Sequence, residues 1–169
     1  MAVFSFGFGD DVTMEAPDVM RTKAKLQKKA RIGVVAGQYN AELSRALVDS
    51  TCKELDRMDL GIEVGCFLVP GAFEVPLVVK RLAQKRHYEA IIALGVIVRG
   101  ETAHGNLIGT VVTEALMQIA LEFSIPVIHE VLLVDNEEQA RQRVCGGRSD
   151  RGSEAAQVAV EMVRVVANL

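Results

Sequence analysis

Strand-like and helix-like segments alternate along this chain from Arg31 onward, and that alternation constrains the fold more than any other feature. Short apolar runs predict strands over residues 31–36, 62–69, 90–98 and 126–134. Apolar residues at helical spacing predict helices over residues 41–58, 75–84, 104–123, 137–143 and 152–167. The apolar face expected for the last helix consists of Ala155, Ala156, Ala159, Met162, Val163 and Val166.

This order of elements predicts a flavodoxin-like three-layer α/β sandwich. Crossovers between parallel strands are right-handed and place helices over both faces of the sheet. We therefore expect a four-stranded parallel sheet of order 2-1-3-4. A chain of 169 residues is long enough for one domain with a sizeable core, which we place at residues 30–169.

Residues 1–29 form a poor folding unit. Phe4, Phe6 and Phe8 are spaced by small residues, and an acidic pair and then several lysines follow them. We expect an N-terminal extension that is mobile or packs against a neighbouring subunit.

Composition excludes several classes of protein. The net charge of −3 gives no sign of attraction to nucleic acid or to a membrane surface, and no apolar run approaches the ~20 residues of a membrane span. The N-terminus lacks the pattern of a secretory signal, so a cytoplasmic location is expected. Cys52, Cys66 and Cys145 show no metal-ligand spacing, and we interpret them as reduced thiols, with Cys52 and Cys66 filling the core.

Ligands of open α/β sheets bind beyond the carboxyl ends of the strands, so the loops at those ends are the candidate site. The loop after the third strand reads Arg99-Gly100-Glu101-Thr102-Ala103-His104 and leads into a helix. A helix N-terminus holds anions such as phosphate with its free N–H groups. His104 adds a side chain of the type that titrates near neutral pH. The loop therefore predicts a phosphate cradle beside a group that transfers protons.

Two other loops carry aromatic residues at the same edge. Tyr39 follows the first strand and Phe73 the second, and each ring either stacks on a planar heterocycle or fills the edge of the sheet. Glu74 starts a helix, where its carboxylate either caps the helix or accepts hydrogen bonds from a polyol or an amine.

Arginine and histidine side chains complete the set of candidates. Arg143 ends the short helix and is either a phosphate ligand or a solvated charge, whereas Arg148 and Arg151 are interpreted as solvated loop charges. His129, mid-way to late on the fourth strand, either faces the site or fills the end of the sheet. His87 is interpreted as a surface residue.

Three motifs in register resemble the lumazine synthase family, whose members act in riboflavin biosynthesis. The motifs are Arg99 to His104, Val69-Pro70-Gly71-Ala72-Phe73-Glu74-Val75-Pro76, and Gln139 through Glu154. The resemblance covers about residues 31–168, and the spacing agrees without gaps from Gly71 through His129 to Arg143.

The resemblance implies a reaction and a set of site residues. Members of the family condense 5-amino-6-(ribitylamino)uracil with 3,4-dihydroxy-2-butanone 4-phosphate, release phosphate and water, and use no metal or organic cofactor. By this resemblance His104 transfers protons, Arg143 binds the phosphate, and Glu101 and Thr102 hold it through their N–H groups. The resemblance implies that the other substrate meets Tyr39, Ala72, Phe73, Glu74, Val96, Ile97, Val98 and, from a neighbouring subunit, His129.

The family assembles as pentamers that share sites between subunits, and in some members twelve pentamers close into a shell. The positive mean hydropathy of the chain is consistent with buried subunit contacts. Gly105, Asn106 and His129 depart from the residues usual in the family, as does Arg148 in the linker. They leave open two alternatives, a non-catalytic relative that binds flavin or lumazine and a relative that only forms shells.

Overall fold

The computed structural model describes residues 30–144 and 150–169. The expected N-terminal extension, residues 1–29, lies outside the described residues, and so do Cys145 and Arg148. The elements run in the order β1 (Arg31–Gly37), α1 (Ala41–Arg57), β2 (Glu63–Val69), the 3-10 turn η2 (Ala72–Glu74), α2 (Val75–Lys85), β3 (Ala90–Val98), α3 (His104–Phe123), β4 (Val127–Val134), α4 (Glu137–Val144) and α5 (Arg151–Ala167).

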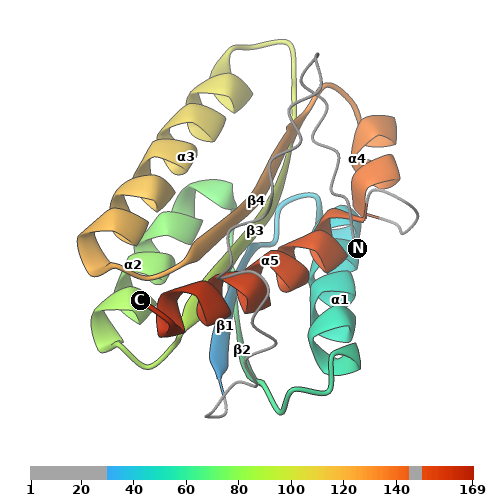
Figure 1. Cartoon of the computed structure of the whole chain (residues 1–169). Helices are drawn as coiled ribbons and strands as arrows, with labels where there is room; N and C mark the ends of the chain where they lie inside the picture. The colour runs from blue at the N-terminus through green and yellow to red at the C-terminus, as the bar shows by residue number, and fades with distance from the viewer. Residues whose placement is uncertain (1–29, 145–149) are drawn as a thin grey trace, which may run out of the picture.

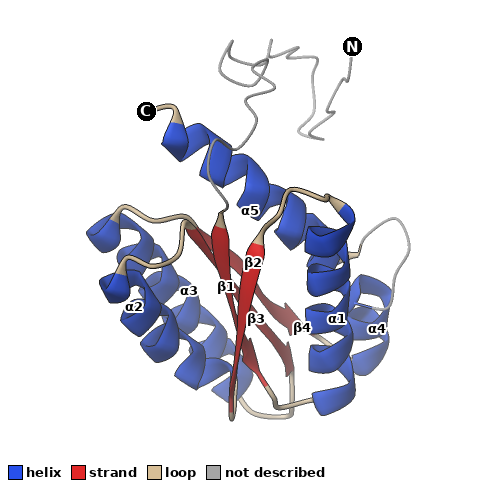
Figure 2. Ribbon diagram, turned by 90° about the horizontal axis from the view of Figure 1, so that it is seen from below, coloured by secondary structure: helices blue, strands red, loops and turns tan. Residues whose placement is uncertain are grey.

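The sheet has the predicted topology. Its four strands are all parallel and lie in the order β2-β1-β3-β4. Helices α2 and α3 cover one face, and α1, α4 and α5 cover the other, which gives three layers (Figures 1 and 2). The predicted α/β sandwich is confirmed. In the two described segments no helix has both the length and the apolar character to cross a membrane.

The core has two halves separated by the sheet. Ile32, Val34 and Ile92 pack under α1 and α5, while Val35, Ile91 and Ala93 pack under α2 and α3. Strands buried on both faces explain why Ala90–Val98 is a continuous apolar run rather than an alternating one.

Part of the apolar face predicted for α5 is wrong. Val160 is buried, whereas Met162 is 37% exposed and Val166 is 41% exposed. The buried stripe continues from Ala156 through Val160 to Val163, one helix turn at a time, so Met162 and Val166 fall on its flank.

The interpretation of Cys52 and Cys66 as core residues is also wrong. Cys52 is only half-buried on α1, and Cys66 is exposed on β2. Strand β2 lies at one edge of the sheet, and all its residues before Val69 are exposed or half-buried, unlike those of β1 and β3.

Glu54 joins α1 to α5 through a buried carboxylate. It accepts hydrogen bonds from Arg57 Nε and Nη2, both at 2.7 Å, and from Gln157 Nε2 at 2.8 Å. These hydrogen bonds, the one from Arg57 above all, lower the pKa of Glu54 from 4.5 to about 2.

That lowered pKa predicts an acid-dependent loss of stability. The unfolded chain takes up the proton first, so stability present above pH 4.5 is lost as the pH falls toward about 2. We expect the free energy of unfolding, from denaturant titrations at about pH 6 and about pH 3, to fall less in Glu54→Gln than in the wild type. Glu161→Gln, which removes an exposed partner of Arg164, is the control and should keep the wild-type slope. An unchanged slope in Glu54→Gln would contradict the assignment.

Candidate active site

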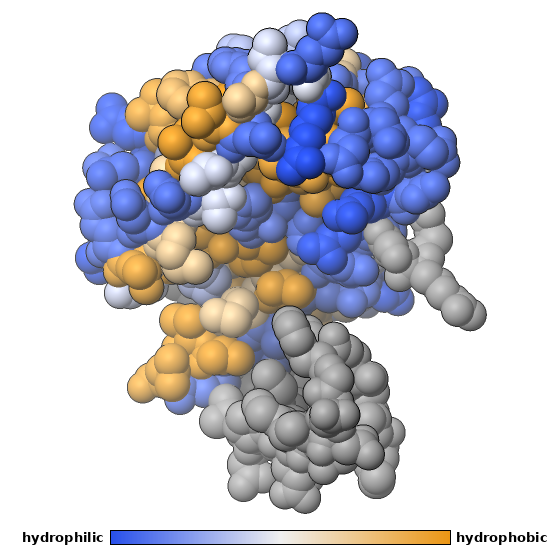
Figure 3. Space-filling model, turned by 90° about the horizontal axis from the view of Figure 1, so that it is seen from above, coloured by the Kyte–Doolittle hydropathy of each residue, from blue (hydrophilic) through white to orange (hydrophobic). Residues whose placement is uncertain are grey.

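The loops after all four strands begin at one edge of the sheet. The register pairs Gly37 with Val69 and Val98 with Val134, so β1 and β2 end together, as do β3 and β4. The loop between β3 and α3 and the start of α4 lie at the upper end of the molecule in Figure 1. Seen from that end, apolar areas interrupt the polar surface (Figure 3).

Backbone hydrogen bonds join these loops in pairs. Gln38 N donates to Val69 O at 2.8 Å, and Tyr39 N donates to Pro70 O at 3.1 Å. On the other side, Arg99 N donates to Val134 O at 2.8 Å. The loops of β1 and β2 therefore form one unit, and those of β3 and β4 form another.

Gly37 allows the first two loops to approach so closely. A Cβ atom on Gly37 would lie 2.8 Å from the carbonyl carbon of Gly71 and 2.9 Å from the nitrogen of Ala72. Both are backbone atoms, which cannot move aside as a flexible side chain can. The absence of a side chain at Gly37 therefore leaves room for the turn at Gly71 and Ala72, which precedes Phe73.

We expect Gly37→Ala to destabilise the fold by about 1–3 kcal/mol, as overpacking does elsewhere. Chemical denaturation measures the effect. Gly100→Ala is the matched control in another loop of the same edge, where an added Cβ meets nothing within 4 Å. Equal stability of the two variants would show that the close approach has no energetic consequence.

Asn40 connects the first pair of loops to strand β3. Its backbone is left-handed, with φ 57° and ψ 55°, and it precedes α1. Its side-chain Nδ2 donates to Val96 O on β3 at 2.9 Å. Asparagine tolerates the left-handed conformation better than most residues do, so one residue supplies both the turn and the bond. Sequence reasoning missed this residue, although an Asn directly before a helix is a recognisable signal.

Two substitutions separate the two contributions of Asn40. Asn40→Gly keeps the left-handed backbone and loses the hydrogen bond, so we expect a destabilisation of about 1 kcal/mol. Asn40→Ala loses both, and we expect about 2–3 kcal/mol. Urea titrations measure the difference, and an alanine variant as stable as the glycine variant would rule out the backbone contribution.

The exposure of the two aromatic rings speaks against one of the two alternatives left open by the sequence. Tyr39 is 76% exposed and Phe73 is 62% exposed, so neither ring fills the edge of the sheet. Glu74 is the N-cap residue of α2, but its side chain makes no capping hydrogen bond. Ala72 lies half-buried beside these residues. In the single chain, these side chains are available to a ligand.

The loop from Arg99 to His104 is open to solvent around the start of α3. Glu101, Thr102 and His104 are exposed, and α3 begins at His104 without a side-chain hydrogen bond from its N-cap. The bond from His104 N to Thr102 Oγ1 is long, at 3.4 Å. Val96 is buried and Ile97 and Val98 are half-buried at the end of the adjoining strand.

The Arg99 side chain links this loop to the start of α3 and to the end of β4. Sequence reasoning also missed this role. Its Nε donates to Asn106 Oδ1 at 2.9 Å, and its Nη1 binds Asp135 Oδ1 at 2.6 Å. Asn106 therefore supplies a partner for Arg99. At Gly105 an added Cβ would lie 3.3 Å from Ile97 Cγ2, so a small residue lets α3 start close to β3.

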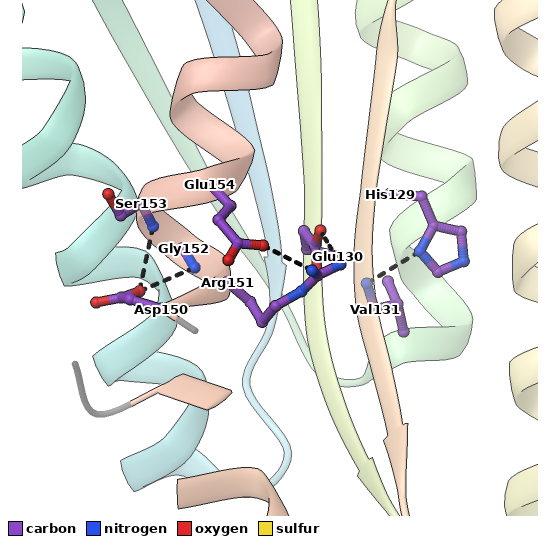
Figure 4. A network of polar contacts seen from close by, with 8 residues as sticks. All are labelled: His129, Glu130, Val131, Asp150, Arg151, Gly152, Ser153 and Glu154. Atoms are coloured by element: carbon purple, nitrogen blue, oxygen red, sulfur yellow. Dashed lines mark hydrogen bonds and ion pairs between the residues drawn. The ribbon is translucent and has the colours of Figure 1, made fainter. Parts of the chain in front are cut away.

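Arg143 and Arg151 lie in different environments. Arg143 is exposed in the last turn of α4. Arg151, interpreted above as a solvated charge, instead forms two hydrogen bonds with buried Glu130, at 3.1 and 2.9 Å, and one with Glu154 at 2.6 Å (Figure 4). Burial raises the pKa of Glu130, and the Arg151 guanidinium acts in the opposite direction. Arg151 thus fixes the start of α5 to β4.

His129 does not lie at this edge of its own chain. It is the third residue of β4, opposite Ala93, so the expected position mid-way to late on the strand is wrong. The ring points away from Glu130 (Figure 4), and its Nε2 lies 2.7 Å from Thr113 Oγ1.

The hydrogen bonds of His129 describe a neutral imidazole. Val131 N donates to Nδ1 at 3.2 Å, and the Thr113 hydroxyl already donates to Gly109 O, so Nε2 carries the proton. Burial lowers the pKa of His129 and favours the same form.

Comparison with known proteins identifies the family. The chain matches the family described as 6,7-dimethyl-8-ribityllumazine synthase over residues 29–167. The chain belongs to the lumazine synthase family. Curated relatives of that name include one from Coxiella burnetii, 36% identical over 137 residues that make up 80% of this chain and 91% of the relative. Another, from Paraburkholderia phytofirmans, is 39% identical over 140 residues, which are 82% of this chain and 81% of the relative.

Membership assigns this chain an enzymatic activity of the transferase class in riboflavin biosynthesis. A third lumazine synthase, from Verminephrobacter eiseniae, is 37% identical over 82% of this chain and 88% of its own length. The two alternatives, a flavin-binding relative and a shell-forming relative without activity, are not favoured by these matches.

Proposed function

We propose that the carboxyl edge of this sheet condenses 5-amino-6-(ribitylamino)uracil with 3,4-dihydroxy-2-butanone 4-phosphate. The products are the lumazine, phosphate and water. The observation that carries the proposal is the meeting, at one edge, of the loops that bear the lumazine synthase motifs. The same residues in separate places would not support a two-substrate reaction.

The first pair of loops binds the pyrimidine. Tyr39 and Phe73 offer exposed rings on which a flat heterocycle stacks, which is worth about 0.5–1.5 kcal/mol beyond the burial of area. Glu74 accepts hydrogen bonds from the ribityl hydroxyls, and the 3-10 turn with Ala72 contacts the same chain. The backbone of Val96, Ile97 and Val98 closes the side of the ring that faces β3.

The second pair of loops binds the butanone phosphate. Glu101 and Thr102 directly precede Ala103, the N-cap of α3, so their N–H groups lie close to a helix N-terminus, where the dipole favours an anion. Arg143 provides a guanidinium for the phosphate oxygens.

Holding the two substrates together is the main contribution to the rate. The exocyclic amine attacks the ketone carbon, and positioning two reactants supplies up to about 7–11 kcal/mol. His104 adds about 10²–10⁴-fold by moving protons during imine formation, phosphate elimination and ring closure. No step in this scheme requires a metal or an organic cofactor.

The active form that we propose is a homo-pentamer, acting in the cytoplasm, in which adjacent subunits share each site. A cyclic head-to-tail ring joins two different patches of one chain. Helix α3 exposes several large apolar side chains, namely Leu107, Val111, Met117 and Leu121, and such a patch is typical of an interface. The distance of His129 from its own edge supports its delivery to a neighbour's pyrimidine. Native mass spectrometry distinguishes a pentamer from a shell of twelve pentamers.

Mixing the purified protein with both substrates and following lumazine absorbance tests the reaction. Product formation that depends on both substrates supports the proposal. Tight riboflavin binding without product would replace it with a binding function, and intact shells without turnover would replace it with a structural one.

A further inference from the structure

Two thiols on different elements face each other on the side of the sheet that α1 covers. Cys52 lies on α1 and Cys66 on β2, and their sulfur atoms are 3.7 Å apart. Cys66 is exposed and Cys52 is half-buried behind it. Neither residue belongs to a site loop.

We propose that Cys52 and Cys66 form a modification site, a dithiol that hydroperoxides oxidise to an intramolecular disulfide and that dithiol reductants reopen. A disulfide has an S–S length of about 2.05 Å, so the sulfur atoms must approach by about 1.7 Å. Both elements already pack on β1, where Cys66 pairs with Val34, so side-chain rotation rather than unfolding brings them together.

The unequal exposure of the two thiols sets the order of the reaction. Cys66 meets the oxidant first: its sulfur attacks a peroxide oxygen, the O–O bond breaks, and water or an alcohol leaves. The sulfur of Cys52 then attacks Cys66, the S–O bond breaks, and the thiol proton leaves with the hydroxide as water. With hydrogen peroxide, the two thiols lose two electrons and two protons, and the peroxide becomes two molecules of water.

The environment of Cys52 fits its role as the second thiol. Burial, followed by the neighbouring Cys66, raises the pKa of Cys52 from 9.0 to about 12. A thiol that stays protonated is a poor first nucleophile toward peroxide. Its contact with Cys66 nevertheless makes it the nearest group to capture an oxidised sulfur.

Two other interpretations of the pair fit less well. Packing does not explain it, because Cys66 is exposed. A metal centre does not either, because no group of three or more His, Cys, Asp or Glu side chains within residues 30–144 and 150–169 is arranged to hold an ion.

The disulfide would join α1, which follows the loop with Tyr39, to β2, which precedes the loop with Phe73. It would close a loop between residues 14 positions apart. Because such a cross-link restricts the unfolded chain, we expect oxidation to raise the Tm by about 5 °C or more. The site residues themselves stay unmodified.

The test uses the full-length protein and needs no substrate, so it is independent of the proposed function. Wild type, Cys145→Ser, Cys52→Ser and Cys66→Ser are treated with hydrogen peroxide, alkylated, digested and analysed by mass spectrometry. In wild type and Cys145→Ser only, we expect a disulfide-linked pair of peptides with Cys52 and Cys66, two hydrogens lighter than the sum of the reduced peptides. Dithiothreitol should separate this pair into the two reduced peptides. Cys52→Ser should accumulate a sulfenic acid at Cys66 that dimedone traps, whereas Cys66→Ser should keep an unmodified Cys52.

Thermal melts before and after oxidation complete the test. The rise in Tm should occur in wild type and Cys145→Ser, and it should be absent from both other variants. If Cys52 and Cys66 remain separately alkylated after peroxide, or if either pairs with Cys145 or with a second chain, the proposal is overturned.

Discussion

Replacement of His104 by alanine is expected to lower kcat about 10²–10⁴-fold, the usual contribution of a positioned general acid–base group. Turnover should remain measurable, because positioning of the two substrates supplies more of the rate than proton transfer does. Steady-state kinetics from lumazine absorbance give the value.

His87→Ala is the matched control for His104. His87 is exposed in the loop between α2 and β3, and its Nδ1 lies 3.1 Å from Arg31 Nη1, at the opposite end of the strands from the site. Its removal should leave kcat unchanged. A His104→Ala enzyme with the full wild-type rate would remove this side chain from the mechanism.

Arg143→Ala is expected to lower kcat/KM for the butanone phosphate about 10–100-fold through a higher KM. The factor corresponds to the loss of a charge-assisted hydrogen bond worth about 1.5–3 kcal/mol. The KM for the pyrimidine substrate should change little, because that substrate carries no phosphate. Initial rates measured while each substrate is varied in turn separate the two constants.

Arg141 provides a control on the same helix. It is bound to Glu137 at 3.2 Å, so Arg141→Ala removes the same charge without removing the proposed phosphate ligand. Arg143→Lys, which keeps the charge and loses the planar fork, should fall between wild type and alanine. Equal increases in the KM for the butanone phosphate in Arg141→Ala and Arg143→Ala would show that the loss of one positive charge, and not of a phosphate contact by Arg143, causes the effect.

The sequence predicted the sheet well because its inner strands are buried on both faces. Ala90–Val98 and the helix from His104 to Phe123 have the expected bounds, since a continuous apolar run and a long periodic pattern are strong signals. Prediction was weaker where burial is partial. Cys66 lies on β2, whose residues before Val69 are all exposed or half-buried, and the apolar pattern of this strand does not show how little of it is covered.

The candidate site was predicted as a set of loops but not as a connected structure. Parallel topology alone brings Tyr39, Phe73 and His104 to one edge. The bracing of Arg99 by Asp135 and of Asn40 by Val96 depends on contacts between residues far apart in the chain. Arg151 was misread for the same reason, because its partner Glu130 lies on a strand 21 residues away.

The pairing of the loops divides the proposed catalytic edge into two structurally separate halves. The loops after β1 and β2, proposed to bind the pyrimidine, and those after β3 and β4, proposed to bind the phosphate, each have their own backbone hydrogen bonds, and the Asn40 amide joins the first pair to Val96 of β3. The loops proposed to bind the ring can therefore be redesigned for another heterocycle while the loops proposed to bind the phosphate keep their hydrogen bonds. The hydrogen bond from Asn40 to Val96 is the place where changes in the first pair of loops would reach β3, the strand that leads into the second pair.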